Sequence, residues 1–286
     1  MGDIVKIGWS GGKDSTCAVM KHIERGDQVK AVCYIPMFTK DVPLILKSHY
    51  QFIKETARYF QSLGAKVYFA LGGLTYYEYV THIAKKGKYK GRMFGFPCVG
   101  RGMCGFKRDG KIRALKKCDV GPYDYEGVGI AYDETSRHSQ LNENFRSILY
   151  ELKITEDEAR RFDEVHGILS PHYSYNFGKK NNRDGCSICP NATYKEFEAW
   201  VRDYPQAVPI ILELQRIVRK YRPENRPLRG HRWFIDGRKD KRIIEEAEWA
   251  LYISCVRKYS STYAEEGMRN GRKSNKKKEK PFGNRA

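Results

Sequence analysis

A short segment near the start of the chain has the residue types of an anion-binding turn. The segment, Ser10-Gly11-Gly12-Lys13-Asp14-Ser15, lies between an apolar run at 4–9 and a helical pattern at 14–25. A strand, a glycine turn and a helix N-terminus together direct backbone N–H groups and a positive helix dipole at a ligand. The two glycines carry no Cβ and allow a phosphate to approach closely. Lys13 adds a positive charge, and hydroxyl groups come from Ser10, Ser15 and Thr16.

Four of the eight cysteines have a spacing that is typical of a metal centre. Cys98 and Cys104 form one pair, and Cys186 and Cys189 form a Cys-x-x-Cys pair. Four thiolates suit a 4Fe–4S cluster and a structural Zn²⁺ site equally well, so the spacing leaves the metal open. A redox dithiol at Cys186 and Cys189 is a third interpretation, and four unrelated thiols are a fourth.

The chain is strongly basic, with a net charge of +19 that is concentrated in part near its C-terminus. Two further segments are rich in Lys and Arg, at 107–117 and 216–242, and the second interleaves them with aromatic residues. Arginine with aromatic side chains suits phosphate contact and base stacking, which makes a nucleic acid a candidate partner. A solvated basic surface accounts for the same composition equally well.

The sequence has no pattern typical of a secreted or a membrane protein. No apolar run approaches the about 18–20 residues that a membrane-spanning helix needs. The first residues include Asp3 and Lys6 and contain no apolar core of a signal peptide. Eight cysteines in such a chain indicate thiols, metal binding or redox chemistry rather than disulfides. We expect a cytoplasmic protein without a membrane partner, and the sequence leaves its oligomeric state open.

The elements that must position these residues alternate between strand-like and helix-like patterns. The expected strands are 4–9, 29–36, 66–71 and 127–132, and the expected helices between them are 14–25, 47–63, 75–86 and 107–117. This alternation predicts an α/β fold with a parallel twisted sheet and helices on both faces. Ligands of such sheets bind at the carboxyl ends of the strands, where the glycine turn lies.

A mainly helical part is expected to follow the α/β domain. We predict the α/β domain over residues 1–150 and a helical part with the Cys-x-x-Cys pair over 151–258. Residues 259–286 have almost no apolar content and predict a basic disordered tail. The helices expected in the second part are 155–166, 193–203, 208–220 and 240–257.

The glycine segment matches the PP-loop, Ser-Gly-Gly-x-Asp-Ser, of the N-type ATP pyrophosphatases. Other motifs resemble the phosphoadenosine phosphosulfate reductase family, in the branch common in phages, mobile elements and DNA-modification loci. One is Gly129-Ile130 followed by Asp133-Glu134-x-x-Arg137, and another is Gly185-Cys186-x-x-Cys189-Pro190. Cys104 with Lys107 resembles a cysteine-to-lysine element of the same family. The resemblance covers about residues 3–205.

The resemblance implies a nucleotide-binding fold like that of the adenine nucleotide alpha hydrolases, and cleavage of ATP between its α and β phosphates. Two departures from the true sulfonucleotide reductases bear on the activity. The chain lacks their C-terminal Glu-Cys-Gly-x-His motif, since Cys255 is followed by neither Gly nor His. Those reductases also tend to have a degenerate PP-loop, whereas this one is intact. Both departures favour ATP pyrophosphatase chemistry over reduction of an adenylylsulfate. The resemblance then implies sulfur transfer to an adenylated acceptor, and the basic charge of the chain favours a nucleic acid as that acceptor.

The resemblance and the charge of the leaving group assign expected roles to single residues. Pyrophosphate leaves with a large negative charge, so we expect Lys13, the loop amides and Mg²⁺ to stabilise it. Asp14, Asp133 and Glu134 are the expected catalytic and Mg²⁺-binding carboxylates, and a surface ion pair with Arg137 is the alternative for the last two. Arg137 and Tyr34 are expected beside the nucleotide. Tyr34 would stack on the adenine, and a plain core position for Tyr34 is an equal alternative.

Two other functions stay open. One is a thiol-dependent reductase of phosphoadenosine phosphosulfate, for which only Cys186, Cys189 or Cys255 could serve as the catalytic cysteine. The other is a nucleotide-sensing, nucleic-acid-binding module of a defence or mobile-element system, without turnover. The preferred enzyme would use ATP with Mg²⁺, a 4Fe–4S cluster or structural Zn²⁺, a DNA or tRNA acceptor, and a sulfur donor such as a cysteine desulfurase.

Overall fold

The computed structural model describes most of the chain as far as Tyr221. The described residues are 2–71, 73–87, 89–97, 99–100, 103–175, 185–189 and 192–221. The predictions for Cys98, for a helix at 240–257 and for a tail at 259–286 lie outside the described residues. No helix in the described part of the chain is long and apolar enough to cross a membrane.

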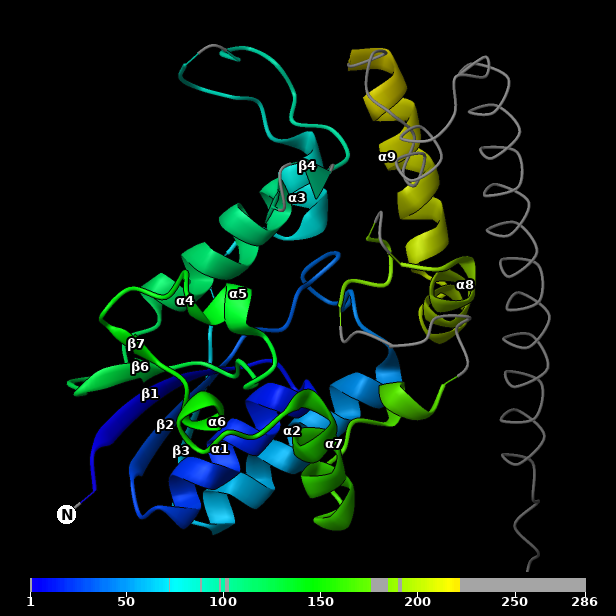
Figure 1. The fold of residues 1–286 in the computed structure, drawn as a ribbon. Helices are drawn as coiled ribbons and strands as arrows, with labels where there is room; N and C mark the ends of the chain where they lie inside the picture. Colours follow the sequence, from blue (N-terminus) through cyan, green and yellow to red (C-terminus); the bar gives the residue numbers. More distant parts are fainter. Residues whose placement is uncertain are drawn as a thin grey trace, which may run out of the picture.

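A five-stranded parallel sheet with the order β3-β2-β1-β6-β7 forms the centre of the fold (Figure 1). The strands are β1 (Ile4–Trp9), β2 (Gln28–Cys33), β3 (Lys66–Phe69), β6 (Tyr125–Gly127) and β7 (Phe145–Arg146). Ile7 in β1 lies opposite Ala31 of β2 on one side and opposite Gly127 of β6 on the other. The α/β fold that the sequence predicts is confirmed, and its central strand leads directly into the glycine turn.

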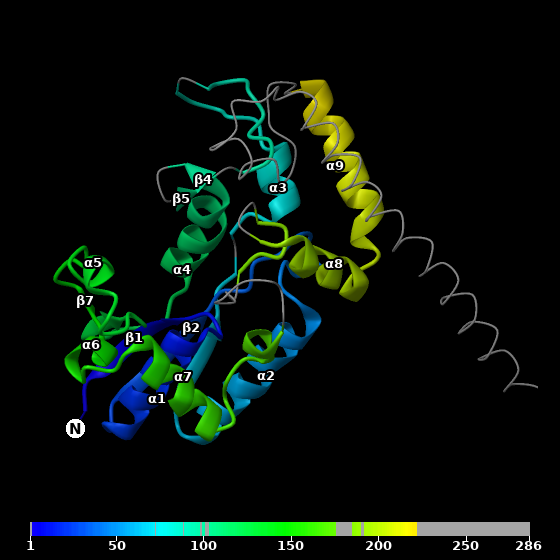
Figure 2. The ribbon, with the colours of Figure 1, turned by 45° about the vertical axis from the view of Figure 1, so that its right-hand side comes forward.

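Helices cover both faces of the sheet, and the side-chain alternation of β2 shows how. Ala31 and Cys33 belong to one apolar core with the helices α1 (Lys13–Glu24) and α2 (Lys47–Ser62). Val32 points the other way, into a smaller core with Ala114 of α4 (Arg113–Lys117). Figure 2 shows α1, α2 and α7 (Glu156–Val165) on one side of the sheet and α4 on the other.

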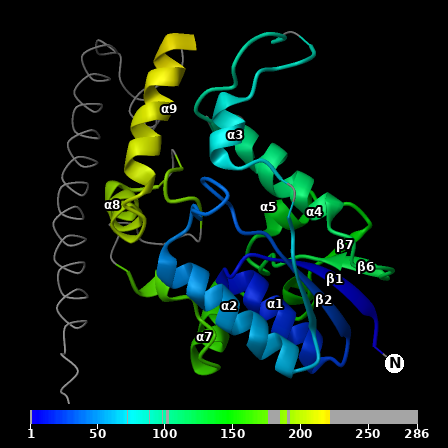
Figure 3. The same ribbon diagram turned by 180° about the vertical axis from the view of Figure 1, so that it is seen from behind.

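A second apolar core joins the C-terminal helices to the segments that follow β2 and β3. It is built from α3 (Tyr76–Thr81), α8 (Tyr194–Asp203) and α9 (Ala207–Tyr221), with apolar residues of the segment 38–46. Trp200 is buried there and donates its indole N–H to the Pro43 carbonyl oxygen at 2.8 Å. Figure 3 shows α9 beside α3, and the end of α8 meets the start of α2, where the Lys47 backbone N–H donates to Asp203 Oδ2 at 2.8 Å. The helices predicted at 193–203 and 208–220 are confirmed as α8 and α9.

Several boundaries differ from those that the sequence predicts. The helix expected at 75–86 ends at Thr81, and the basic helix expected at 107–117 begins as a π-helix, Lys107–Ile112, before α4. The strand expected at 127–132 shares only Gly127 with β6 (Tyr125–Gly127), because the chain leaves the sheet there and passes against α1. Six short elements of the described chain have no counterpart in the prediction: β4 (Val99–Gly100), β5 (Met103–Cys104), β7 (Phe145–Arg146), α5 (Thr135–His138), α6 (Ile148–Glu151) and the 3₁₀ turn Pro171–Ser174.

Candidate functional site

The glycine turn connects the central strand β1 to the first residue of α1. Gly12 is the N-cap of α1 and has no side chain with which to cap the helix. Gly11 has a φ of +78°, and a Cβ at this position would lie 2.8 Å from Cε1 of His49. Glycine is thus required at position 11 by its backbone conformation and by the imidazole next to it. The backbone N–H of Lys13 donates to the Tyr173 hydroxyl at 3.1 Å, so this amide contacts an oxygen acceptor in the structure.

The hydroxyl groups of the turn brace its own backbone. Ser15 Oγ donates to the Gly12 carbonyl oxygen at 3.0 Å and accepts from the Ser10 backbone N–H at 3.2 Å. Thr16 is fully buried, and its Oγ1 accepts from the Trp9 indole N–H at 3.0 Å. The Thr16 hydroxyl therefore joins the end of β1 to α1 and does not face outward from the turn. Of the three predicted hydroxyl ligands, Ser10 is the one whose Oγ contacts only another hydroxyl, Ser15 Oγ at 3.3 Å.

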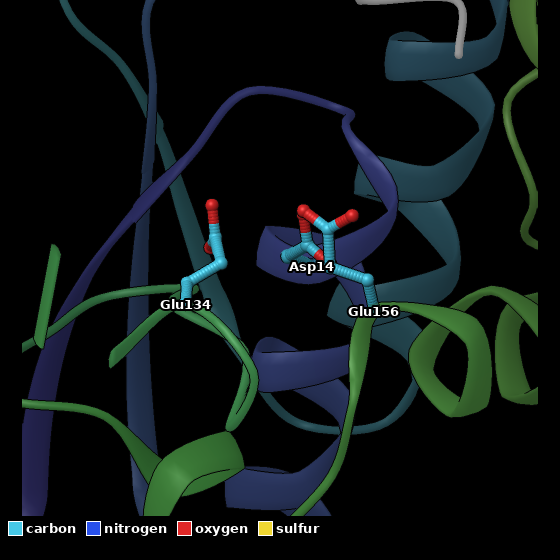
Figure 4. A group of neighbouring side chains, drawn as sticks. All are labelled: Asp14, Glu134 and Glu156. Atoms are coloured by element: carbon cyan, nitrogen blue, oxygen red, sulfur yellow. The ribbon is translucent and has the colours of Figure 1, made fainter. Parts of the chain in front are cut away.

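Three carboxylates converge beside the turn, and the three together are called the carboxylate group below. Oxygen atoms of Asp14, Glu134 and Glu156 all lie within 4.8 Å of one another. Figure 4 shows the three side chains directed at one point from the first turn of α1, the residue before α5 and the start of α7. Lys13 Nζ lies 2.7 Å from Asp14 Oδ1 and 3.6 Å from Glu156 Oε2. Burial raises the pKa of Asp14, and the hydrogen bond from Lys13 opposes this shift.

The approach of two chain segments brings these carboxylates together. A Cβ at Gly129 would lie 2.6 Å from the Ser15 nitrogen, so only glycine allows this segment to pass so close to α1. Beyond it, the Tyr132 backbone N–H donates to the Ile154 carbonyl oxygen at 2.8 Å, which joins this segment to the residues before α7. Glu134 and Glu156 reach Asp14 through this pair of contacts.

The structure gives Asp133 a different role from the predicted one. Asp133 Oδ1 accepts a hydrogen bond from the Glu156 backbone N–H at 3.0 Å, at the first residue of α7. The carboxylate group contains Glu156 but not Asp133. Asp133 instead positions Glu156 through this hydrogen bond. The Thr155–Glu158 capping signal predicts the helix that Glu156 begins, but the prediction did not assign Glu156 to the site.

Glu134 and Arg137 form an ion pair on the surface side of the carboxylate group. The predicted alternative, an ion pair with Arg137, is therefore present at Glu134. Glu134 also contributes to the carboxylate group. Arg137 is more than half exposed and lies near enough to Lys111 for its charge to lower the pKa of that lysine. The predicted contact of Arg137 with a nucleotide stays a prediction.

Tyr34 lies in the apolar core on the α4 face of the sheet. It is buried with Val32 and Ala114, and burial raises the pKa of its hydroxyl. A Cβ at Gly110 of the π-helix would lie 2.6 Å from Tyr34 Oη, which shows how closely the two segments pack. This placement favours the core interpretation of Tyr34 over adenine stacking.

Lys111 is a partly buried cation that the sequence shows only as part of a basic segment. Burial lowers the pKa of Lys111, as do the charges of Lys107 and Arg137, and thiolates at Cys33 and Cys186 would oppose them. Lys111 is therefore near enough to Arg137, Cys33 and Cys186 for their charges to affect its pKa. A π-helix is a frequent sign of a functional position, and Lys111 belongs to one here.

Three of the four predicted metal-ligating cysteines are described. Burial raises the pKa of Cys186, and so do the neighbouring thiols of Cys189 and Cys104. The Cys189 backbone N–H donates to the Cys186 carbonyl oxygen at 2.8 Å, as expected for a tight Cys-x-x-Cys turn. A four-cysteine metal centre stays a prediction.

The basic segment at 107–117 is exposed along one side. Arg108 pairs with Asp109 at 2.7 Å, and the exposed cations on the π-helix and α4 include Lys107, Arg113, Lys116 and Lys117. Most of the second basic segment, from residue 222 to 242, lies outside the described part of the chain.

The chain matches no protein-family model, and no curated protein is similar to it at a significant level. The resemblance to the PP-loop enzymes therefore rests on the motifs of the sequence, and the placement of their residues comes from the structure alone.

Proposed function

We propose that this protein is an ATP pyrophosphatase that adenylates an acceptor. The observation that carries the proposal is the position of Lys13, at the N-terminus of α1, beside three converging carboxylates. A cationic turn suits phosphate, and a carboxylate group suits a divalent ion, so the pair suits a nucleoside triphosphate with its metal. The intact PP-loop motif that follows β1 supports the same substrate.

In the proposed reaction, an oxygen of the acceptor attacks the α-phosphorus of ATP. The bond from this phosphorus to the oxygen that bridges the α and β phosphates breaks, and its electron pair leaves with pyrophosphate. Lys13 and the first amides of α1 would stabilise the charge that grows on the leaving group. The Lys13 side chain would turn for this purpose from its present contacts with Asp14 and Glu156 toward the phosphates.

Asp14, Glu134 and Glu156 would hold Mg²⁺. Carboxylate oxygens are the donors that this ion prefers, and three of them lie within 4.8 Å of one another with Lys13 as a neutralising cation. When bound, the ion supplies positive charge to the phosphates. Asp133 would keep the third carboxylate in place through its hydrogen bond to the Glu156 amide.

The proposal extends to sulfur transfer. A sulfur nucleophile, supplied by a donor such as a cysteine desulfurase, would displace AMP from the adenylated acceptor. The exposed cations on the π-helix and α4 support a nucleic acid, DNA or tRNA, as the acceptor. Cys98, Cys104, Cys186 and Cys189 would hold a 4Fe–4S cluster or a structural Zn²⁺ ion. A cytoplasmic location, where ATP and free thiols are available, completes the proposal.

Incubation of the full-length protein with Mg²⁺, α-labelled ATP and a nucleic acid pool tests this function. We expect AMP and pyrophosphate in equal amounts, and their loss in Lys13→Met and Asp14→Asn. Lys21→Met is the matched control, because Lys21 lies on the same helix but pairs with Glu24 at 2.7 Å, away from the turn. Release of ADP and phosphate would contradict the proposal. Sulfite release from the sulfonucleotide without ATP cleavage would identify a reductase instead.

A further inference from the structure

Tyr173 comes from far along the chain to the glycine turn. It belongs to the 3₁₀ turn Pro171–Ser174, and its hydroxyl accepts the backbone N–H of Lys13 at 3.1 Å. Lys13 is the first residue of α1, so this N–H is one of those that a phosphate in the turn would contact. We propose that the Tyr173 hydroxyl competes with phosphate for the Lys13 amide and thereby sets the affinity of the turn. This inference rests on the proposed function.

Buried polar pairs hold the backbone of the 3₁₀ turn in place. Ser170 Oγ lies 2.8 Å from His49 Nδ1, and both residues are buried. His172 Nε2 lies 3.7 Å from Glu196 Oε1 of α8, in a second buried pair. His49 also lies against Gly11, so the glycine turn and the 3₁₀ turn rest on the same imidazole. The Tyr173 hydroxyl is therefore delivered to Lys13 by a fixed backbone, and only its side chain needs to rotate when a phosphate enters.

The competition follows from the single proton of the Lys13 amide. One N–H makes one well-aligned hydrogen bond, so a phosphate oxygen and the phenol oxygen cannot both receive it at full strength. An ionised phosphate oxygen is the stronger acceptor and displaces the neutral hydroxyl. Binding of phosphate nevertheless breaks the hydrogen bond from the Lys13 amide to the Tyr173 hydroxyl, and this loss lowers the affinity for phosphate. The net free energy of one neutral hydrogen bond corresponds to about a two- to tenfold change in Kd.

Calorimetric titration of the full-length protein with magnesium pyrophosphate tests the proposal. We expect Tyr173→Phe to bind pyrophosphate about two- to tenfold more tightly than the wild type, because the competing acceptor is gone. Tyr175→Phe is the matched control. Its hydroxyl donates to Ser48 Oγ at 3.0 Å and does not contact the glycine turn, so we expect an unchanged Kd.

Hydrogen exchange at the Lys13 amide provides a second measurement. Without ligand, this amide should exchange faster in Tyr173→Phe than in the wild type and in Tyr175→Phe. An unchanged or weaker affinity of Tyr173→Phe for pyrophosphate would overturn the proposal, as would equal exchange rates in the three proteins. Binding of pyrophosphate to the wild type and Tyr173→Phe with equal affinity would refute only the role of Tyr173. No binding to either protein would refute the proposed function as well.

Discussion

Asp163 of α7 is a buried carboxyl group without a hydrogen-bond partner. It is fully inaccessible to solvent, and neither of its oxygens is bonded within the described part of the chain. Burial raises the pKa of Asp163 from its ordinary 3.8 to about 9, with a smaller contribution from the charge of Asp14 in the same direction and an opposing one from Lys13. The folded protein therefore keeps this group protonated at neutral pH, whereas the unfolded chain ionises it.

This difference lowers the free energy of unfolding as the pH rises from the unfolded pKa toward the folded one. Between 3.8 and about 9, the folded state binds a proton that the unfolded state has released, and above this range both states are ionised. At 1.36 kcal/mol per pKa unit, the loss at about pH 7 is on the order of 4 kcal/mol. Asp163→Asn cannot ionise, so we expect it to be more stable than the wild type by about 2–4 kcal/mol at this pH, the lower value allowing for an unbonded buried amide.

Urea unfolding of both proteins at about pH 6, 7 and 8, with a chelator present, measures this effect. The advantage of Asp163→Asn should grow by about 1.4 kcal/mol per pH unit. Asp157→Asn is the matched control, because Asp157 is an exposed carboxylate on the same helix, and its effect should stay within about 0.5 kcal/mol. An advantage that does not change with pH, or a less stable Asp163→Asn at the highest pH, would refute the reasoning.

Three further predictions concern the site. Glu156→Gln should weaken Mg²⁺ binding, measured by calorimetry without nucleotide, because it removes the charge of one of the three converging carboxylates. Asp133→Ala should raise the Kd for Mg²⁺ by about tenfold, a smaller effect than that of Glu156→Gln, because it removes only the acceptor of the Glu156 amide. A larger effect of Asp133→Ala than of Glu156→Gln would contradict these roles. Gly129→Ala should lower the free energy of unfolding by about 1–3 kcal/mol, since the new Cβ meets the Ser15 nitrogen at 2.6 Å. Gly8→Ala, with no atom within 4 Å of its Cβ, should not, and equal effects would contradict the packing argument.

The parts of the fold that local patterns encode could be predicted from the sequence. The apolar run at 4–9, the glycine pair and the helical pattern after it are contiguous, and the structure has β1, the turn and α1 in that order. The capping signal at Thr155 and Glu158 likewise marks the start of α7. In these cases the residues that decide the structure are neighbours in the chain, so their spacing is sufficient.

The carboxylate group could not be predicted in full, because contacts between distant segments assemble it. Asp133 and Glu134 are adjacent in the sequence, yet one caps an amide of α7 and the other faces Asp14. Which of the two faces Asp14 depends on the path of the chain at Gly129, where it leaves the sheet earlier than the apolar pattern indicates. Glu156 enters the group only because α7 packs on α1, and no spacing within the sequence encodes that packing.

The π-helix Lys107–Ile112 contains one residue more than an α-helical segment of the same rotation needs. Its hydrogen bonds span one more residue than those of an α-helix, so the extra residue bulges out of the turn. Deletion of one residue inside it would return the segment to α-helical bonding, and the side chains on either side would keep their directions about the helix axis. The same deletion inside Arg113–Lys117 would rotate everything before it by about 100° relative to the sheet. The π-helix is therefore a place where the chain can lose a residue while Cys104 and the packing of α4 stay in place.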